Sequence, residues 1–401
     1  MSLRLLPLLL VSLLLAACAP SAPSGPTPYT FDLPPDFPTP RVSRENPITV
    51  EKVELGRLLF YDRRLSINEA GSCASCHEQR KAFTDGRGRA IGPTGELHPR
   101  SAMSLANAVY NSRQNWANPI LGSLEQQHIA VLFSTDPVEM GWKDNEVRIL
   151  QRLADDATYP ALFAAAFPEE AEPITRMTVV KAIASFSATL ISGRAPYDRG
   201  EMSPAAERGA ELFNSERLEC FHCHGAFNFA QSVQGEHTRV DTTEFKNTGL
   251  YNIPGPADGL PLTTGNYPTG NQGLYEFSGR RFDMGRFRAP TLRNIALTAP
   301  YMHDGSIATL SDVITEHYGR AGRTITDGPH AGVGTDNPYK DPLLQGFTLE
   351  PDELADLLAF FDALTDWDFI CNPDFADPFG HVPMHTRCGE QTARLTAPQQ
   401  D

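Results

Sequence analysis

Two pentapeptides of the form C-x-x-C-H constrain this 401-residue chain more than any other feature of its sequence. They occupy residues 73–77 and 220–224. Two thiols at this spacing can each form a thioether with one vinyl group of a porphyrin, and the adjacent His can then ligate the iron. The groups concerned are Cys73, Cys76 and His77 in the first copy and Cys220, Cys223 and His224 in the second. A redox-active C-x-x-C motif and half of a zinc site are the alternatives, but neither demands a His directly after the second Cys. The sequence therefore predicts two covalently bound c-type haems.

The first 18 residues have the pattern of a bacterial export signal. Arg4 provides a positive charge, and residues 5–15 form an apolar run that is too short for a stable membrane span. The run leads into Leu-Ala-Ala-Cys, which resembles the site at which lipoproteins are cleaved and lipidated, here on Cys18. An ordinary secretory signal is the alternative. Residues 19–45 are rich in Pro and Ser and are expected to form an extended tether. We therefore expect a periplasmic lipoprotein, attached to the outer membrane through its lipid only.

The remaining cysteines and the net charge restrict the environment and the partners of the chain. Once Cys18 and the haem-attachment thiols are assigned, Cys371 and Cys388 are left over. In an oxidising compartment these two are expected to form a disulfide, with two free buried thiols as the alternative. The formal net charge of −15 argues against nucleic acid and anionic membrane surfaces as partners.

An internal repeat accompanies the two motifs. Residues 54–65 precede the first motif and residues 207–218 the second, and Glu, Gly, Leu, Phe and a later Leu fall at the same offsets in both. We interpret this as one helix and one haem loop used twice, giving cytochrome c-like domains at 46–200 and 201–401. At the shared Gly a second helix can approach closely, and the shared Phe would pack on the porphyrin edge. The paired residues are Gly56 and Phe60, Gly209 and Phe213.

The rest of the chain reads as mainly helical. Apolar residues follow the 3.6-residue period over 179–191 and 354–364, and Thr309 and Thr348 stand where helix N-caps are expected. Long alternating apolar runs are absent from the sequence, so little β structure is predicted. Residues 225–288 are rich in Gly, Pro, Asn and Thr; they would line the second haem, face a partner or simply cover the domain.

Two further segments carry a family resemblance. Residues 288–294 read Arg-Ala-Pro-Thr-Leu-Arg-Asn, and residues 298–305 read Thr-Ala-Pro-Tyr-Met-His-Asp-Gly. With the two haem motifs, they resemble the bacterial di-haem cytochrome c peroxidase and MauG superfamily over residues 47–366. The wording of 115–119 and 283–288 is similar to the MbnH-like branch.

The resemblance implies a role for each haem and for several side chains. The haem on His77 is the peroxide-reactive one with an open face, and the haem on His224 is six-coordinate. Glu139 matches the distal acid, and Gln127 its polar neighbour, although the gap between them is two residues longer here. Trp116 matches the tryptophan between the two haems. The ligands implied for a calcium ion between the domains are Asn107, Thr298 and Pro300.

The chemistry of peroxide cleavage gives Glu139 a physical task. A proton must leave the near oxygen and reach the far one, and a carboxylate in an apolar pocket has a raised pKa suited to both steps. The alternative is a surface Glu that caps a helix after Pro137. Trp116 offers a π-system that can relay an electron hole, and it would also serve as a buried core anchor.

The second axial ligand of the haem on His224 separates the functional hypotheses. A peroxidase that receives electrons from a cytochrome uses Met there, because a thioether favours ferrous iron. At the matching place this chain has His317 and Tyr318. Tyrosinate favours ferric and higher-valent iron, which is the MauG-like pattern. We predict Tyr318 as the ligand, with His317 as the rival and a purely structural role for both as the third possibility.

The resemblance implies an enzyme that uses hydrogen peroxide. The leading hypothesis is a MauG/MbnH-like oxidoreductase, whose high-valent di-haem state oxidises an aromatic residue, Trp in particular, of an exported partner protein. The first alternative is a cytochrome c peroxidase that draws electrons from a small c-type cytochrome or cupredoxin. The second alternative is a di-haem electron carrier without enzymatic activity.

Overall fold

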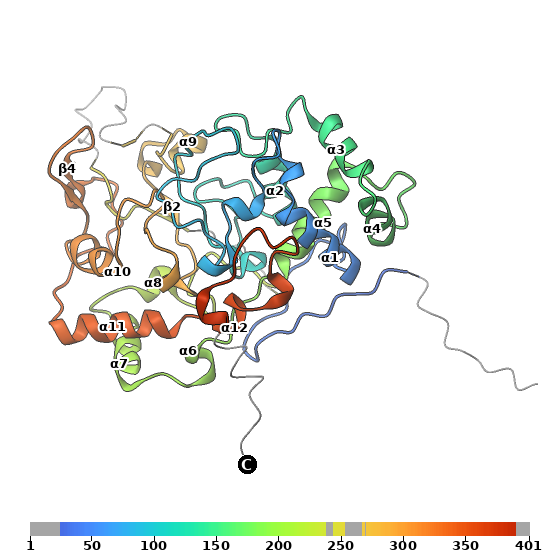
Figure 1. Ribbon diagram of the computed structural model, residues 1–401. Helices are drawn as coiled ribbons and strands as arrows, with labels where there is room; N and C mark the ends of the chain where they lie inside the picture. The colour runs from blue at the N-terminus through green and yellow to red at the C-terminus, as the bar shows by residue number, and fades with distance from the viewer. Residues whose placement is uncertain (1–24, 238–243, 253–266, 269, 390–401) are drawn as a thin grey trace, which may run out of the picture.

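The computed structural model describes residues 25–237, 244–252, 267–268 and 270–389. Over these residues the protein is mainly helical, and its strands form two short antiparallel pairs, β1 with β2 and β3 with β4 (Figure 1). This confirms the predicted mainly α fold with little sheet. The helices are α1 (Val50–Tyr61), α2 (Leu124–Phe133), α3 (Glu146–Ala154), α4 (Tyr159–Ala166), α5 (Arg176–Ala188), α6 (Pro196–Arg199), α7 (Pro204–Phe213), α8 (Phe221–His224), α9 (Tyr275–Ser278), α10 (Leu310–Asp312), α11 (Pro351–Ala363) and α12 (Trp367–Ile370). The strands are β1 (Phe245–Lys246), β2 (Phe287–Arg288), β3 (Thr324–Ile325) and β4 (Gly332–Val333).

Helices α1 and α5 cross at Gly56 and form the core of the N-terminal half. A Cβ atom on Gly56 would overlap the carbonyl group of Ala182, so only glycine permits this approach. Phe60, one turn further along α1, is fully buried and packs edge-on against Phe186 of α5, with ring centroids 5.3 Å apart. The predicted close helix approach at Gly56 is therefore confirmed.

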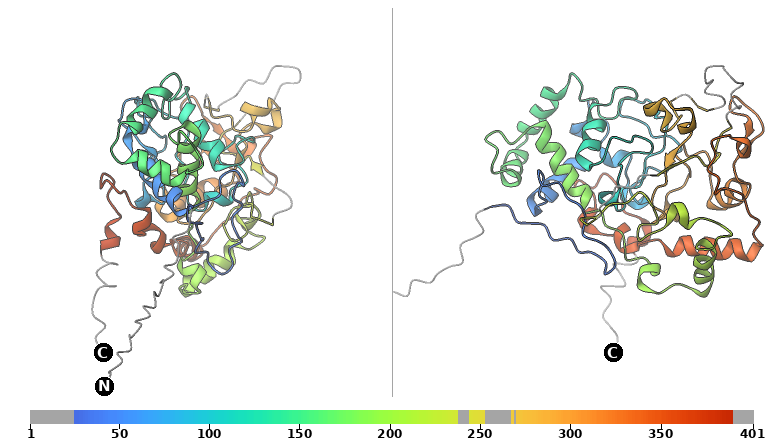
Figure 2. Two further views of the ribbon diagram at one scale, coloured as in Figure 1. Left: turned by 90° about the vertical axis from the view of Figure 1, so that its right-hand side faces the viewer. Right: turned by 180° about the vertical axis from the view of Figure 1, so that it is seen from behind.

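Helices α7 and α11 cross in the same way at the opposite end of the molecule (Figures 1 and 2). A Cβ atom on Gly209 would overlap the carbonyl group of Asp356. Phe213 lies one turn further along α7, and its ring centroid is 5.2 Å from that of Phe360 on α11. Each C-x-x-C-H motif thus follows a helix that is crossed at a glycine, with a buried Phe four residues beyond it.

The segment after α11 does not stay with α7 and α11 but packs on the N-terminal core. Phe369 of α12 contacts Phe83 (ring centroids 5.5 Å apart), and the Tyr61 hydroxyl donates to the Phe375 carbonyl oxygen (2.7 Å). Figure 1 shows α12 in red beside the blue α1. The structure contains the disulfide between Cys371 and Cys388, in this same segment. This segment belongs to the predicted second domain, residues 201–401, but it packs on the N-terminal half. The predicted domain boundary at residue 200 therefore does not account for its position.

The N-terminal segment differs in part from a free tether. Residues 1–24, which include the signal sequence and Cys18, lie outside the described residues. From residue 25 onward the segment has almost no regular structure, as predicted, but it lies against the protein. Phe37 is buried among aromatic rings, and its ring centroid is 4.7 Å from that of Phe227. The Tyr110 hydroxyl donates to the Pro38 carbonyl oxygen (2.7 Å). Among the described residues, every helix is too short or too polar to cross a membrane.

The predicted helix starts are right at one position and wrong at another. Thr309 caps α10, and its side chain accepts a hydrogen bond from the Asp312 N–H. Thr348 is not a cap, because α11 begins at Pro351 with Glu350 at the N-cap position. Proline is favoured at the first helical position because its φ is already helical and its missing N–H is not needed there.

Candidate haem sites and the cavity between them

The first C-x-x-C-H motif presents its His in an orientation suited to iron ligation. The Nδ1–H of His77 donates to the Phe83 carbonyl oxygen (2.8 Å), which fixes the ring and leaves Nε2 for a metal. Cys73 and Cys76 are not joined in a disulfide. Burial raises the pKa of both thiols to about 12. Reactive redox thiols have lowered pKa values, so this environment argues against a C-x-x-C redox motif.

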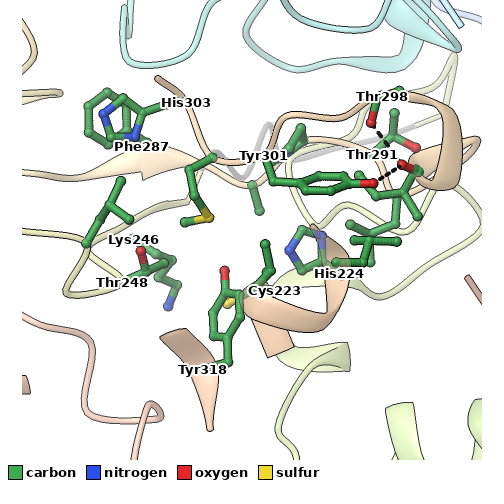
Figure 3. A pocket seen from close by; sticks show the side chains of 18 of the residues that line it. Cys223, His224, Lys246, Thr248, Phe287, Thr291, Thr298, Tyr301, His303 and Tyr318 are labelled. Atoms are coloured by element: carbon green, nitrogen blue, oxygen red, sulfur yellow. Dashed lines mark hydrogen bonds between the residues drawn. The ribbon is translucent and has the colours of Figure 1, made fainter. Parts of the chain in front are cut away.

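The second motif repeats this arrangement at the wall of a large cavity. The Nδ1–H of His224 donates to the Phe229 carbonyl oxygen (3.1 Å). His224 lines the cavity together with both thiols of its motif, and most of the wall is apolar. Figure 3 shows His224 and Cys223 at this wall. The apolar side chains of the wall include Phe213, Leu218, Leu250, Leu292, Ile314 and Phe361. An apolar cavity that two thiols and one oriented imidazole enter fits a covalently attached porphyrin.

The zinc alternative is not supported. Among the described residues, the only His, Cys, Asp and Glu side chains close enough to share one metal ion are Glu216, Glu219 and His222. This group lies at the partly exposed edge of the second motif and contains no thiol. Within the described ranges, the thiols of the two motifs therefore lack the further ligands that a zinc site requires.

Trp116 lies on the same cavity, which extends toward the first motif. The cavity wall includes Thr84, next to the Phe83 carbonyl that orients His77, as well as His224. The indole Nε1–H of Trp116 donates to the Ser101 carbonyl oxygen (3.0 Å), so the ring is held in place. The structure thus places Trp116 at the cavity that connects the surroundings of the two motifs.

Tyr318, and not His317, faces the cavity of the second motif. Both residues lie in a π-helix, η7 (Val313–Tyr318), which follows α10 directly. Tyr318 lines the cavity with His224, and Figure 3 shows its phenol ring pointing into it beside Cys223. Burial and the nearby thiols raise the pKa of Tyr318. His317 is absent from the cavity wall and fully buried, and burial lowers its pKa to about 3.

Methionine sulfur is also available at this cavity. Met103 and Met302 line it, whereas Met284 is fully buried in a cluster with Tyr251 and Tyr267. The Met103 sulfur is 3.7 Å from the Arg288 guanidinium. A thioether ligand would have to come from a loop, since the π-helix that supplies Tyr318 contains no Met.

Glu139 lies close to the first motif in a desolvated position. Burial raises the pKa of Glu139 to about 7. Its negative charge contributes to the raised pKa values of Cys73 and Cys76, so the carboxylate is near both haem-attachment thiols. A carboxyl group with a pKa near neutrality can both accept and return a proton.

Helix α2 contributes two partly buried polar side chains to the N-terminal half. The side-chain oxygen Oε1 of Gln127, the predicted neighbour of Glu139, is buried and has no hydrogen-bond partner among the described residues. His128, which sequence reasoning missed, is hydrogen-bonded through Nε2 to the Ser187 hydroxyl (3.2 Å). Burial lowers the pKa of His128 to about 4, with a smaller contribution from His77. A lone His on an amphipathic helix gives no signal in the sequence, so only the fold reveals this position.

The predicted calcium ligands are not brought together at the cavity. Thr298 and Pro300 line it, but Asn107 does not. The Asn107 carboxamide is engaged elsewhere: Oδ1 accepts from the Ser192 N–H (2.8 Å), and Nδ2 donates to the Ser192 carbonyl oxygen (2.7 Å) and to Asn228 Oδ1 (2.9 Å). Asn107 thus joins three loops of the protein, and the calcium ion stays a prediction.

His303 is a second buried residue that sequence reasoning missed. Its ring stacks on Phe287, with centroids 3.6 Å apart and an interplanar angle of 14° (Figure 3). It also meets the Trp116 ring edge-on, with centroids 6.5 Å apart. Burial lowers its pKa to about 4, so the imidazole is neutral at pH 7. The only signal in the sequence was its place within residues 298–305, one of the segments that carry the family resemblance.

Comparison with known proteins agrees with this arrangement. The family model for di-haem cytochrome c peroxidases matches residues 50–203. The cytochrome-c peroxidase IdrP1 of Denitromonas iodatirespirans is 30% identical, over 93% of this chain and 96% of the relative. The methylamine utilization protein MauG of Methylophilus methylotrophus is also 30% identical, over 89% of this chain and 94% of the relative.

A solved structure is more similar still. The crystal structure of a MauG-like protein associated with microbial copper homeostasis is 46% identical, with a TM-score of 0.83 over 88% of this chain and 99% of that one. The two relatives and the solved structure match 88–93% of this chain, well beyond the residues that the family model matches. The chain therefore belongs to the di-haem cytochrome c peroxidase and MauG family of peroxide-using oxidoreductases.

Proposed function

We propose that this protein is a MauG-like oxidoreductase, which uses hydrogen peroxide to oxidise an aromatic residue, Trp in particular, of an exported partner protein. The observation that carries the proposal is the Tyr318 phenol in the cavity of His224. The 46% identity to a MauG-like protein adds support. The haems, when bound, would accept the two oxidising equivalents of peroxide and deliver them to the partner.

Tyr318 would determine which redox states are stable at the second haem. A phenolate is a hard anionic ligand and stabilises iron in its higher oxidation states, whereas a thioether stabilises ferrous iron. Ionisation of the buried phenol is unfavourable in the protein alone, since burial and the nearby thiols raise its pKa. Coordination to ferric iron would supply the compensating positive charge.

Glu139 and Trp116 would perform the other two tasks. Glu139 would take a proton from the peroxide oxygen that approaches the first haem and return it to the departing oxygen, which leaves as water. Its pKa of about 7 suits both directions of transfer. Trp116 would pass oxidising equivalents between the haems, because its ring lies on the cavity that connects their surroundings.

The finer organisation is proposed on the same basis. The two glycine crossings and the two matched hydrogen bonds, His77 to Phe83 and His224 to Phe229, support an internal duplication. The first unit would hold the peroxide-reactive haem and the second the six-coordinate one. Export to the periplasm and lipid attachment through Cys18 remain proposals from the sequence.

A cytochrome c peroxidase that receives electrons from a small c-type cytochrome or cupredoxin is the second candidate function. Two observations favour it: the 30% identity to a cytochrome-c peroxidase, and the presence of Met302 on the same cavity wall as Tyr318. Membership of a peroxide-using enzyme family argues against a simple electron carrier.

Peroxide titration of the di-haem protein tests the proposal. We expect a long-lived oxidised spectrum in the wild type and in Met302→Leu, and loss of its persistence in Tyr318→Phe. Tyr110→Phe is the matched control, because it removes a buried hydroxyl that bonds to the Pro38 carbonyl away from the cavity. Unchanged persistence in Tyr318→Phe would remove Tyr318 from the mechanism. Rapid turnover with a reduced cytochrome, dependent on Met302, would establish the peroxidase function instead.

A further inference from the structure

Arg288 is a buried cation at the wall of the haem cavity. It is the second residue of β2, and only 2% of its surface is exposed. Its backbone N–H donates to the Trp116 carbonyl oxygen (2.8 Å), so it lies next to that residue. Among the described residues, its guanidinium makes only long contacts with uncharged groups: the Asn115 and Ala289 carbonyl oxygens and Asn111 Oδ1, each at 3.4 Å, and Met103 Sδ at 3.7 Å. Burial is the sole cause of its lowered pKa, about 10, so it remains charged at pH 7.

Arg293, five residues further along, shows what a satisfied buried arginine looks like in this protein. Its side chain is as buried as that of Arg288. It forms a bidentate ion pair with Asp198, at 2.8 and 2.9 Å, and also donates to the Phe227 carbonyl oxygen (3.0 Å). In the described part of the chain, no carboxylate is paired with Arg288.

An unpaired charge in an apolar interior is strongly unfavourable, so a buried guanidinium requires an anion. We propose that the anion is a haem propionate, and that Arg288 is its counter-ion at the cavity beside Trp116. The propionates are the only anionic substituents of the porphyrin, and a guanidinium binds a carboxylate through two parallel N–H donors. Arg288 lines the cavity that the second haem would fill.

Two other cationic side chains line this wall, and neither meets the same need: Arg87 is exposed to solvent, which stabilises its charge. Lys246 also lines the cavity, but its ammonium group already lies 3.2 Å from both Glu244 and Asp341. Arg288 is thus the buried cation at this wall, and the contacts of its guanidinium are all with uncharged groups. The carboxylate that it requires would come from the bound haem.

The ion pair has an electrostatic consequence for the haem. A fixed positive charge near the iron disfavours the ferric state relative to the ferrous state, and it keeps the propionate ionised at all physiological pH values. Loss of the charge should lower the reduction potential of the haem concerned. It should also make that potential depend on pH, since an unpaired buried propionate would take up a proton.

Spectroelectrochemical titration of the di-haem protein at several pH values tests the inference. The variants are Arg288→Met, which removes the charge, and Arg288→Lys, which keeps it. Arg100→Met is the matched control, because Arg100 lies over the Phe287 ring next to Arg288 but already has Glu276 as its partner (2.8 Å).

We expect Arg288→Met to lower one of the two midpoint potentials and to make it pH-dependent, with little change in Arg288→Lys and Arg100→Met. Equal potentials in Arg288→Met and Arg100→Met would overturn the proposal. If Arg288→Met fails to take up haem, resonance Raman spectra of the wild type and Arg288→Lys provide the test: the propionate bending band of one haem should shift, and an unshifted band refutes the pairing. Wild-type potentials that change when chloride is replaced by a bulky anion would identify a diffusible counter-ion and also refute it.

Discussion

Replacement of Glu139 by Gln tests the proton chemistry of the first haem. The structure gives the size of the effect, because burial raises the pKa of this carboxyl group from 4.5 to about 7. At 1.36 kcal/mol per pH unit, ionised Glu139 destabilises the folded protein by about 3 kcal/mol. The folded protein holds this proton more tightly than the unfolded chain does, so the free energy of unfolding falls as the pH rises from about 4.5 to about 7 and is level above that.

Two assays follow from these values. In stopped-flow mixing with peroxide, the wild-type rate constant should rise with pH to about 7 and then level off, because the carboxylate is the proton acceptor. Glu139→Gln should react roughly 10²- to 10⁴-fold more slowly, without this pH step. In denaturant titrations, Glu139→Gln should be more stable than the wild type by about 3 kcal/mol at pH 8 and equally stable at pH 4.

A nearby carboxylate provides the control for both assays. Glu96 Oε2 accepts a hydrogen bond from the Val138 N–H (2.8 Å), one residue before Glu139, but Glu96 is exposed to solvent. Glu96→Gln keeps an acceptor oxygen for this bond, so its rate profile and stability should match the wild type. A Glu139→Gln protein that reacts with peroxide as fast as Glu96→Gln, with the same pH profile, would refute the assigned role.

Further predictions concern the architecture. Gly56→Ala and Gly209→Ala should each lower the free energy of unfolding by about 1–3 kcal/mol, measured by denaturant titration, since the added methyl group meets a carbonyl of the crossing helix. Gly122→Ala is the control, because a Cβ atom there has no neighbour closer than 3.5 Å and the backbone of Gly122 is not left-handed. Paired Cys371→Ser and Cys388→Ser substitutions should cost about 3 kcal/mol on the chain-entropy model for a bridge across 17 positions, and proteolysis should then release the segment after α11 first. Proteolysis that instead begins within α5 would contradict the conclusion that the disulfide holds the segment after α11 in place.

Several features of the protein could be predicted from the sequence alone, because they depend on residues that lie close together along the chain or on a repeated pattern. Each haem-attachment motif places its thiols and imidazole within five consecutive residues, and chain connectivity holds them together in any fold. The glycine crossings followed from a repeated pattern, and the disulfide from counting cysteines. Helical periodicity indicated α5 and α11, although the cap of α11 was misplaced because Pro351 fixes the start of the helix more strongly than Thr348 does.

The sequence could not decide between His317 and Tyr318 as the residue that faces the cavity. Neighbouring residues on a helix point about 100° apart, so one of the pair faces the cavity and the other does not. The phase depends on the backbone, and here the backbone is a π-helix, which departs from the regular period. The packing of the segment after α11 on α1 could not be predicted either, since sequence periodicity says nothing about contacts between residues 314 positions apart.

The amino-acid sequence alone was enough to identify the two C-x-x-C-H motifs, the helical class and the family, because each rests on residue types at fixed spacing along the chain. Which side chains line the cavity together, and which charged groups lie beside each of them, could be seen only in the folded protein. Arg288 and Arg293 lie five residues apart and cannot be told apart by residue type, yet Asp198 forms an ion pair with Arg293 and not with Arg288. The reason is physical: burial and electrostatic interaction depend on distance in space, and residues such as Asp198 and Arg293 become neighbours only when the chain folds.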